Sequence, residues 1–121
     1  MSTPTFTYLD TELAFSQIGD AQVMDSMLVM LQESLQRDIA LIADLLASDE
    51  LAGANRVLHA LKGFVPIFCC EGFCTQVVDV EALSKVGPSS NVAQAYATLR
   101  PELQRLLDDV NTYLAQSQSA A

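Results

Sequence analysis

The feature that most constrains this chain is the spacing of its apolar residues. Between residues 21 and 47, apolar side chains return at intervals of three and four residues. That period places side chains on one face of an α-helix, whereas a half-buried strand needs strict alternation. The stripe consists of Met24, Met27, Leu28, Leu31, Leu35, Ile39, Ile42 and Leu46. The chain is therefore expected to fold mainly as amphipathic helices.

Shorter stripes of the same kind predict further helices on both sides of the long one. The expected elements are a short helix from Asp10 or Thr11 to Gly19, a helix from near Glu50 to about residue 68, one over about 71–85 and one over about 92–116. Amphipathic helices with short connections predict an all-α fold, an antiparallel four-helix bundle with a short additional N-terminal helix. The length of 121 residues predicts a single domain over 1–121, with a core at about 8–116 and short flexible tails.

Capping residues, turn-forming residues and prolines set the expected boundaries. Asp10 or Thr11 should cap the first short helix, Gly19 should end it, and Asp20 should cap the next helix. Ser48 and Asp49 predict a turn and a new N-cap, and the segment 86–91 is a second turn cluster. Pro66 should kink or fray the last turn of its helix, because proline has no N–H to bond back to the preceding turn. Pro101 should kink the final helix or divide it into two abutting helices.

The charge balance excludes several classes of function. The chain has 15 acidic residues, 6 basic residues and one histidine, a formal net charge of −9. Nucleic acids and anionic membranes need clustered positive charge, so we expect no nucleic-acid partner and no membrane partner. A single histidine excludes multi-histidine metal sites, and no metal or other cofactor is expected. No signal peptide or long apolar run is recognisable, which favours a cytoplasmic protein.

The three cysteines are clustered at Cys69, Cys70 and Cys74. An odd number at this spacing does not form a disulfide framework, and zinc would need more ligands. We interpret them as reduced packing residues. A redox role and a metal-binding role remain weaker alternatives.

The sole histidine lies on the polar face of its helix. On a helical wheel of about 100° per residue, the apolar side chains of this segment centre near 220° from His59. Asn55, Lys62, Gly63 and Pro66 share the histidine's face. Glycine within a helix costs about 1 kcal/mol relative to alanine, so Gly63 suggests close approach by another molecule.

An exposed imidazole can serve as an acid, a base, a ligand or a nucleophile, and a lone surface histidine also commonly has no role. Near His59 the sequence supplies no serine and acidic residue arranged as the partners of a hydrolase histidine. It also supplies no glycine-rich phosphate loop and no carboxylate cluster for Mg²⁺. The residues around His59 are too few to make a complete enzyme.

The segment His59-Ala60-Leu61-Lys62-Gly63 resembles the signature of histidine-containing phosphotransfer (HPt) domains of bacterial two-component phosphorelays. The resemblance continues at the positions fourteen, twenty-one and twenty-two residues after the histidine, which are Phe73, Val80 and Glu81. The start of the chain is also similar to the family's opening, at Leu9-Asp10, Glu12, Ala14 and Ile18-Gly19-Asp20. In all, the resemblance covers about residues 8–115.

The resemblance implies a role for each matched residue. His59 would carry a phosphoryl group on Nε2, and Lys62 would help to neutralise it. Gly63 would leave room for a partner's receiver domain. Glu81 would accept a hydrogen bond from Nδ1–H and so fix the tautomer that leaves Nε2 as the nucleophile. The alternative for Glu81 is an ordinary surface carboxylate.

The resemblance predicts a stand-alone, monomeric phosphorelay intermediate. It would accept a phosphoryl group from the receiver domain of a hybrid sensor kinase and pass it to the receiver of a response regulator. Mg²⁺ is expected on the partner receiver, and no ATP-dependent kinase activity is expected of this chain. An adaptor that binds a kinase or regulator without relaying phosphate is the alternative. A structural or redox module built on the cysteines is a third, weaker one.

The chain departs from the family pattern just after the histidine. Phe64, Val65 and Pro66 stand where small residues are usual, and Cys69 replaces a usual glycine, with Gly72 displaced. Phe64 would either pack at the edge of the bundle or add to an exposed partner patch. Pro66 should reshape the surface near His59. These departures concern the surface on which a receiver domain would dock more than the phosphotransfer chemistry at His59.

Overall fold

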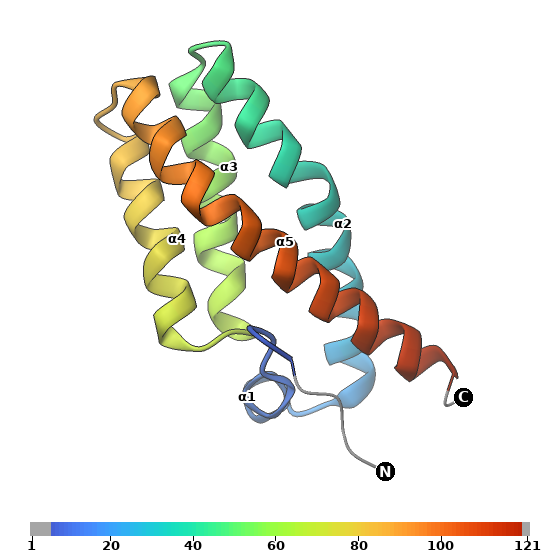
Figure 1. The fold of residues 1–121 in the computed structure, drawn as a ribbon. Coiled ribbons are helices and arrows are strands. Elements are labelled where there is room, and N and C mark those ends of the chain that lie inside the picture. Colours follow the sequence, from blue (N-terminus) through green and yellow to red (C-terminus); the bar gives the residue numbers. More distant parts are fainter. Residues whose placement is uncertain (1–5, 120–121) are drawn as a thin grey trace.

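The computed structural model describes residues 6–119, and all of its regular elements are helical (Figure 1). The elements are α1 (Thr11–Ile18), α2 (Ala21–Ala47), α3 (Leu51–Phe64), the 3₁₀ turn η1 (Val65–Ile67), α4 (Glu71–Ser84) and α5 (Ser89–Ser119). Within residues 6–119, extended pairing is limited to one isolated β-bridge between Leu9 and Cys69. The flexible tails expected at the two ends include residues 1–5 and 120–121, which lie outside the described residues.

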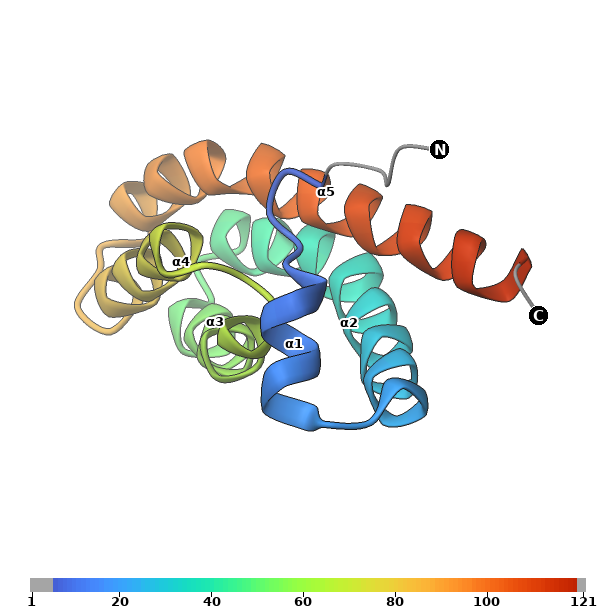
Figure 2. The same cartoon turned by 90° about the horizontal axis from the view of Figure 1, so that it is seen from below.

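The four longer helices share one hydrophobic core. α2 packs against α3 and α5, and α4 packs against the same two helices. α1 lies across one end, where it packs against α2 and η1 (Figure 2). The apolar stripe expected of residues 21–47 is largely buried, at Met24, Leu28, Leu31, Leu35, Ile39, Ile42 and Leu46. The helical period in the sequence therefore corresponds to the core-facing side of α2.

The first two helices begin and end where the sequence predicts. The Asp10 side chain accepts a hydrogen bond from the Leu13 N–H, and Asp20 caps α2 in the same way at Val23. Gly19 ends α1 with a φ of 79°, in the left-handed region that glycine adopts without a steric penalty. The predicted extent of α2 is confirmed.

The start of α3 differs from the expectation. Asp49 does not cap it, because its backbone is left-handed, with a φ of 59°, whereas an N-cap residue is typically extended. The Asp49 carboxylate instead accepts a hydrogen bond from Ser89 Oγ at 2.6 Å. Glu50 occupies the N-cap position without a side-chain bond. At the other end, the fraying expected at Pro66 is confirmed, since α3 gives way to η1 there.

The final helix is longer than expected and does not divide at Pro101. α5 begins at Ser89 and continues through Pro101, which is exposed. Figure 2 shows it as a bowed but continuous helix over the others. Leu99 and Leu103, on either side of the proline, are both buried. Packing on both sides of the proline therefore holds one helix, and the alternative of two abutting helices is wrong.

The segment before α1 is anchored to distant parts of the chain. The N–H groups of Tyr8 and Leu9 donate to the buried Asp109 carboxylate of α5, at 2.8 and 3.2 Å. The Asp10 N–H donates to the carbonyl of Phe68, at 2.7 Å. These bonds hold the corner between α3 and α4 against α5. None of the helices within the described part of the chain is long and apolar enough to span a bilayer.

Substituting Leu58 tests whether the histidine-bearing helix is held by its apolar face. Leu58 is fully buried, so Leu58→Ala should lower the free energy of unfolding by about 2–5 kcal/mol in urea denaturation. Val86 is 78% exposed, and Val86→Ala should change it by less than about 0.5 kcal/mol. Equal losses in the two variants would contradict the packing described here.

Candidate functional site

His59 stands at the surface in the second half of α3. Its side chain is 65% exposed, while Ala54, Leu58 and Leu61 of the same helix are buried. The helix therefore turns its apolar face to the core and leaves the imidazole outside. This exposed position agrees with the one expected from the helical wheel.

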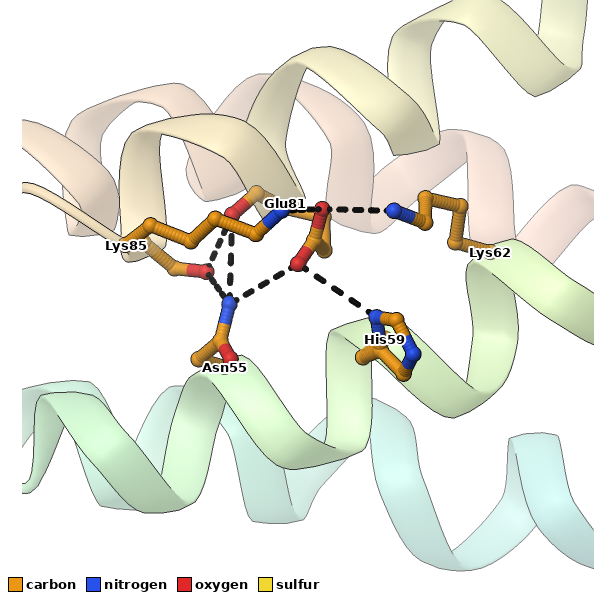
Figure 3. A network of polar contacts seen from close by, with 6 residues as sticks. Asn55, His59, Lys62, Glu81 and Lys85 are labelled. Carbon is orange, nitrogen blue, oxygen red and sulfur yellow. Dashed lines mark hydrogen bonds and ion pairs between the residues drawn. The ribbon is translucent and has the colours of Figure 1, made fainter.

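Beside His59 lies a buried carboxylate from the neighbouring helix. Glu81 of α4 is only 1% exposed, and an ionised carboxylate at such a position needs compensating partners. Lys62 Nζ lies 3.0 Å from Oε1 and Asn55 Nδ2 donates to Oε2 at 2.9 Å (Figure 3). Both partners come from α3, so the carboxylate joins the two helices. The alternative interpretation of Glu81 as a surface carboxylate is wrong.

Further hydrogen bonds fix this contact between the helices. Asn55 Nδ2 also lies within hydrogen-bond distance of Ser84 Oγ, at 2.8 Å, and of the Glu81 carbonyl, at 3.3 Å. The Ser84 hydroxyl itself donates to the Glu81 carbonyl. A single amide on α3 thus contacts both the side chain and the backbone of α4. The orientation of the Glu81 carboxylate is held from two sides.

The imidazole of His59 turns one nitrogen toward this carboxylate. Nδ1 lies 3.6 Å from Glu81 Oε2, as Figure 3 shows, which is longer than an ordinary N–H···O hydrogen bond. Asn55 donates to the same oxygen, and a carboxylate oxygen accepts more than one bond. Nε2 lies on the other edge of the ring. An imidazole arranged in this way presents Nε2 as a nucleophile or base to an external group.

The charges around Glu81 keep it ionised despite its burial. Burial acts to raise the pKa of Glu81, but hydrogen bonds from Lys62 and Asn55, with the charges of Lys62 and Lys85, overcome it and lower the pKa to about 2. Lys85 Nζ lies 3.5 Å from Oε1. The site therefore holds a permanent negative charge behind the exposed imidazole.

The other residues singled out in the sequence occupy different environments. A Cβ atom added to Gly63 would meet no heavy atom within 4 Å, so the fold itself does not require glycine there. Phe64 is half-buried and its ring stacks on Phe68, with the ring centroids 5.5 Å apart, so it packs at the edge of the bundle. Pro66 is exposed within η1. Asn55, His59, Lys62 and Glu81 form one contact network.

Two members of the network were missed by sequence reasoning. Lys85 follows Glu81 by four residues and Ser84 follows it by three, which are the spacings of neighbours on a helix surface. That spacing was available as a signal for Lys85. The hydroxyl of Ser84 carried no comparable signal, because its partner Asn55 comes from another helix.

A hollow elsewhere in the molecule does not include this site. It lies between α2 and α5, with a volume of about 550 Å³, and its lining includes Ala43, Tyr96, Ala97 and Arg100. None of the residues of the His59 network lines it. The imidazole is presented on an outer face of the helices, where a macromolecular partner can reach it.

The cysteines occupy three different environments. Cys69 is buried, Cys74 is half-buried, Cys70 is exposed, and none of them forms a disulfide. Burial raises the pKa of the Cys69 thiol, and burial also raises that of Cys74. A raised thiol pKa lowers the fraction of reactive thiolate. Cys69 belongs to the core and forms the β-bridge with Leu9, and Cys74 packs against the core. The interpretation as a packing residue is wrong for Cys70, which is exposed.

Comparison of the chain with protein-family models, with curated proteins and with solved structures finds no match.

The acid sensitivity of the fold tests the ionised state of Glu81. A carboxylate whose folded pKa is lowered contributes stability above its ordinary pKa, and this contribution is lost as the pH falls toward the folded value. In wild type, the free energy of unfolding should therefore decline between about pH 4.5 and pH 2, because the Glu81 carboxylate becomes protonated over this range. Glu81→Gln should make this decline shallower in urea titrations across that range.

Glu33→Gln, at an exposed position of α2, is the matched control and should leave the decline close to that of wild type. Parallel pH curves for wild type and Glu81→Gln would show that the buried carboxylate does not carry this dependence.

Proposed function

We propose that this chain is a phosphohistidine carrier of the HPt class, a stand-alone relay between receiver domains. The observation that carries the proposal is the pairing of an exposed sole histidine with a buried, ionised carboxylate. Glu81 faces Nδ1 at 3.6 Å, which leaves Nε2 on the outer edge of the ring. Its position is also the one at which the family pattern places an acid or amide.

The arrangement suits attack on an aspartyl phosphate. A neutral imidazole with its proton on Nδ1 has a lone pair on Nε2. As Nε2 bonds to phosphorus, the bond between phosphorus and the aspartyl oxygen breaks, and the aspartate leaves as a carboxylate. The ring becomes an imidazolium, whose Nδ1–H faces Glu81, and the reverse reaction delivers the phosphoryl group to a second receiver. The partner receiver brings Mg²⁺ and this chain brings positioning and the nucleophile.

Lys62 supplies positive charge near the phosphoryl position. It lies one helical turn after His59, its side chain is 28% exposed, and its ammonium group reaches Glu81 in the resting protein. A flexible four-carbon stem allows this ammonium group to turn outward. In the proposed phosphorylated state it shares its charge with the phosphoryl oxygens.

Gly63 supports a docking role for this face. Glycine within a helix is unfavourable by about 1 kcal/mol, and no internal contact compensates for it here. Close approach of a partner's backbone explains the residue. Together with Asn55, the edge of Phe64 and the exposed Pro66, Gly63 belongs to the surface that we assign to receiver domains.

We further propose that the chain is a monomeric antiparallel four-helix bundle. The cyclic packing of α2, α3, α4 and α5 supports an antiparallel four-helix bundle, and the internal use of their apolar faces supports a monomer. We propose a cytoplasmic location, no cofactor of its own, and no nucleic-acid or membrane partner.

An adaptor that binds a receiver without relaying phosphate is the second candidate. The 3₁₀ turn at Val65–Ile67 favours it, because this turn changes the surface directly after the histidine. The interactions around His59 favour the relay, because simple binding does not require an ionised carboxylate behind an imidazole.

Labelling by phosphorylated receivers separates the two candidates. In a panel of receiver domains charged with acetyl phosphate, at least one should transfer phosphate to wild type within minutes. His59→Gln should abolish labelling, since no other imidazole is present. Circular dichroism of the variant serves as the folding control.

Undiminished labelling of His59→Gln would overturn the assignment of the nucleophile. Tight binding of a charged receiver without transfer at any time point would favour the adaptor.

Substituting Gly63 separates a docking role from a folding role. Gly63→Ala should stabilise the protein by about 0.5–1 kcal/mol, because the fold leaves space for the methyl group and the unfolded chain loses freedom. The same variant should slow transfer from a receiver severalfold.

Gly72→Ala is the matched control, because a Cβ atom there also meets nothing within 4 Å. It should leave transfer unchanged. Equal transfer rates for Gly63→Ala and wild type would remove the docking argument.

A further inference from the structure

The two lysines of the chain converge on one oxygen atom. Lys62 approaches Glu81 Oε1 from α3 at 3.0 Å, and Lys85 approaches the same atom from the end of α4 at 3.5 Å. Figure 3 shows the two ammonium groups on opposite sides of this oxygen. In a chain of net charge −9, both lysines thus serve one buried carboxylate.

This arrangement holds more positive charge than the resting site needs. Glu81 contributes one negative charge, the two lysines contribute two positive charges, and a neutral His59 adds none. The amide of Asn55 satisfies the other carboxylate oxygen. One lysine is sufficient to compensate a single carboxylate, so the resting site has one positive charge in excess.

Phosphorylation of His59 would consume that excess. A phosphoryl group brings about two negative charges near neutral pH, and the ring that carries it becomes a cation. The site would therefore gain one net negative charge and become neutral overall. With one lysine alone, Glu81 and the phosphoryl group would compete for the same ammonium group, and a buried carboxylate without its partner is costly.

The positions of the two lysines suit different tasks. Lys62 is on the same helix as His59, one turn away, and is able to turn toward Nε2. Lys85 follows Glu81 by four residues and is the C-cap of α4, in the favourable order for an acid–base pair, so it stays with the carboxylate when α3 side chains rearrange. Its side chain is 55% exposed and free of competing carboxylates in the contacts described.

We propose that Lys85 is a reserve counter-ion: it keeps Glu81 paired when Lys62 turns from Glu81 to the phosphoryl group on His59. This inference rests on the proposed function. Lys85 acts through Glu81 and Lys62, so it is a positioning residue and does not touch the phosphoryl group. The exchange of partners lets one carboxylate stay ionised in both states of the site.

Phosphoramidate provides a test that needs no partner protein. His59 Nε2 attacks its phosphorus, the P–N bond breaks, and ammonia leaves, so that phosphohistidine forms directly. We would follow the phosphohistidine by ³¹P NMR and the Lys62 ammonium group by ¹⁵N NMR in wild type, Lys85→Gln and Lys85→Arg. Phosphorylation should shift the Lys62 resonance in wild type and in Lys85→Arg.

In Lys85→Gln, Lys62 should stay with Glu81, so its resonance should move little on phosphorylation. The phosphohistidine should also decay about 3-fold faster than in wild type, the effect expected for loss of one charge interaction. Lys85→Arg should restore the wild-type half-life, because it keeps the charge. Urea midpoints of the unphosphorylated variants should lie close to that of wild type at neutral pH, because Lys62 and Asn55 still pair Glu81 there, which separates this role from a structural one.

Equal half-lives and equal Lys62 shifts in wild type and Lys85→Gln would overturn the inference while leaving the phosphohistidine in place. Absence of phosphohistidine in wild type would instead contradict the proposed function itself. A second measurement concerns Glu81 directly. In Lys62→Gln, the ¹³C resonance of the Glu81 carboxyl should remain that of a carboxylate at pH 7, and a protonated carboxyl there would show that Lys85 cannot act as its counter-ion.

Discussion

The structure around His59 depends on one constraint, the burial of an ionised carboxylate between two helices. Glu81 is removed from water, so each of its oxygens must find a partner within the protein. Lys62 and Asn55 reach it from α3, and Lys85 reaches it from the C-cap of α4. These contacts tie α3 to α4 beside the imidazole. The exposed histidine therefore faces, at 3.6 Å, a carboxylate that is itself almost fully buried.

The fold supplies the rigid support for this constraint. Leu58 and Leu61 fix α3 in the core, and Val77 and Val80 do the same for α4. Because polar contacts lie at the edge of this apolar interface, small movements of either helix are restrained. The imidazole remains exposed on one side and faces a negative charge on the other. Such pre-organisation suits the proposed transfer of a phosphoryl group to and from His59.

Local signals in the sequence were sufficient for much of the fold. The apolar period and the caps at Asp10, Gly19 and Asp20 located α1 and α2, because these features act within one or two helical turns. The exposed position of His59 followed from the same period. Asp49 was misassigned as a cap, since its left-handed backbone and its bond to Ser89 depend on a distant part of the chain.

Contacts between distant residues were beyond sequence reasoning. The bonds from Tyr8 and Leu9 to Asp109 join residues about one hundred positions apart. The continuity of α5 through Pro101 depends on packing on both of its sides. At the site, the family pattern pointed to Glu81, but its burial and its sharing by two lysines became visible only in three dimensions.

The most direct test of this account is the tautomer of His59 in the unphosphorylated protein. Long-range ¹H–¹⁵N correlation spectra at about pH 8.5, well above the ordinary imidazole range, should show one imidazole, because the chain has one histidine. The account predicts a proton on Nδ1 and a free lone pair on Nε2, with this preference lost in Glu81→Gln. A ring protonated mainly on Nε2 in wild type would contradict it.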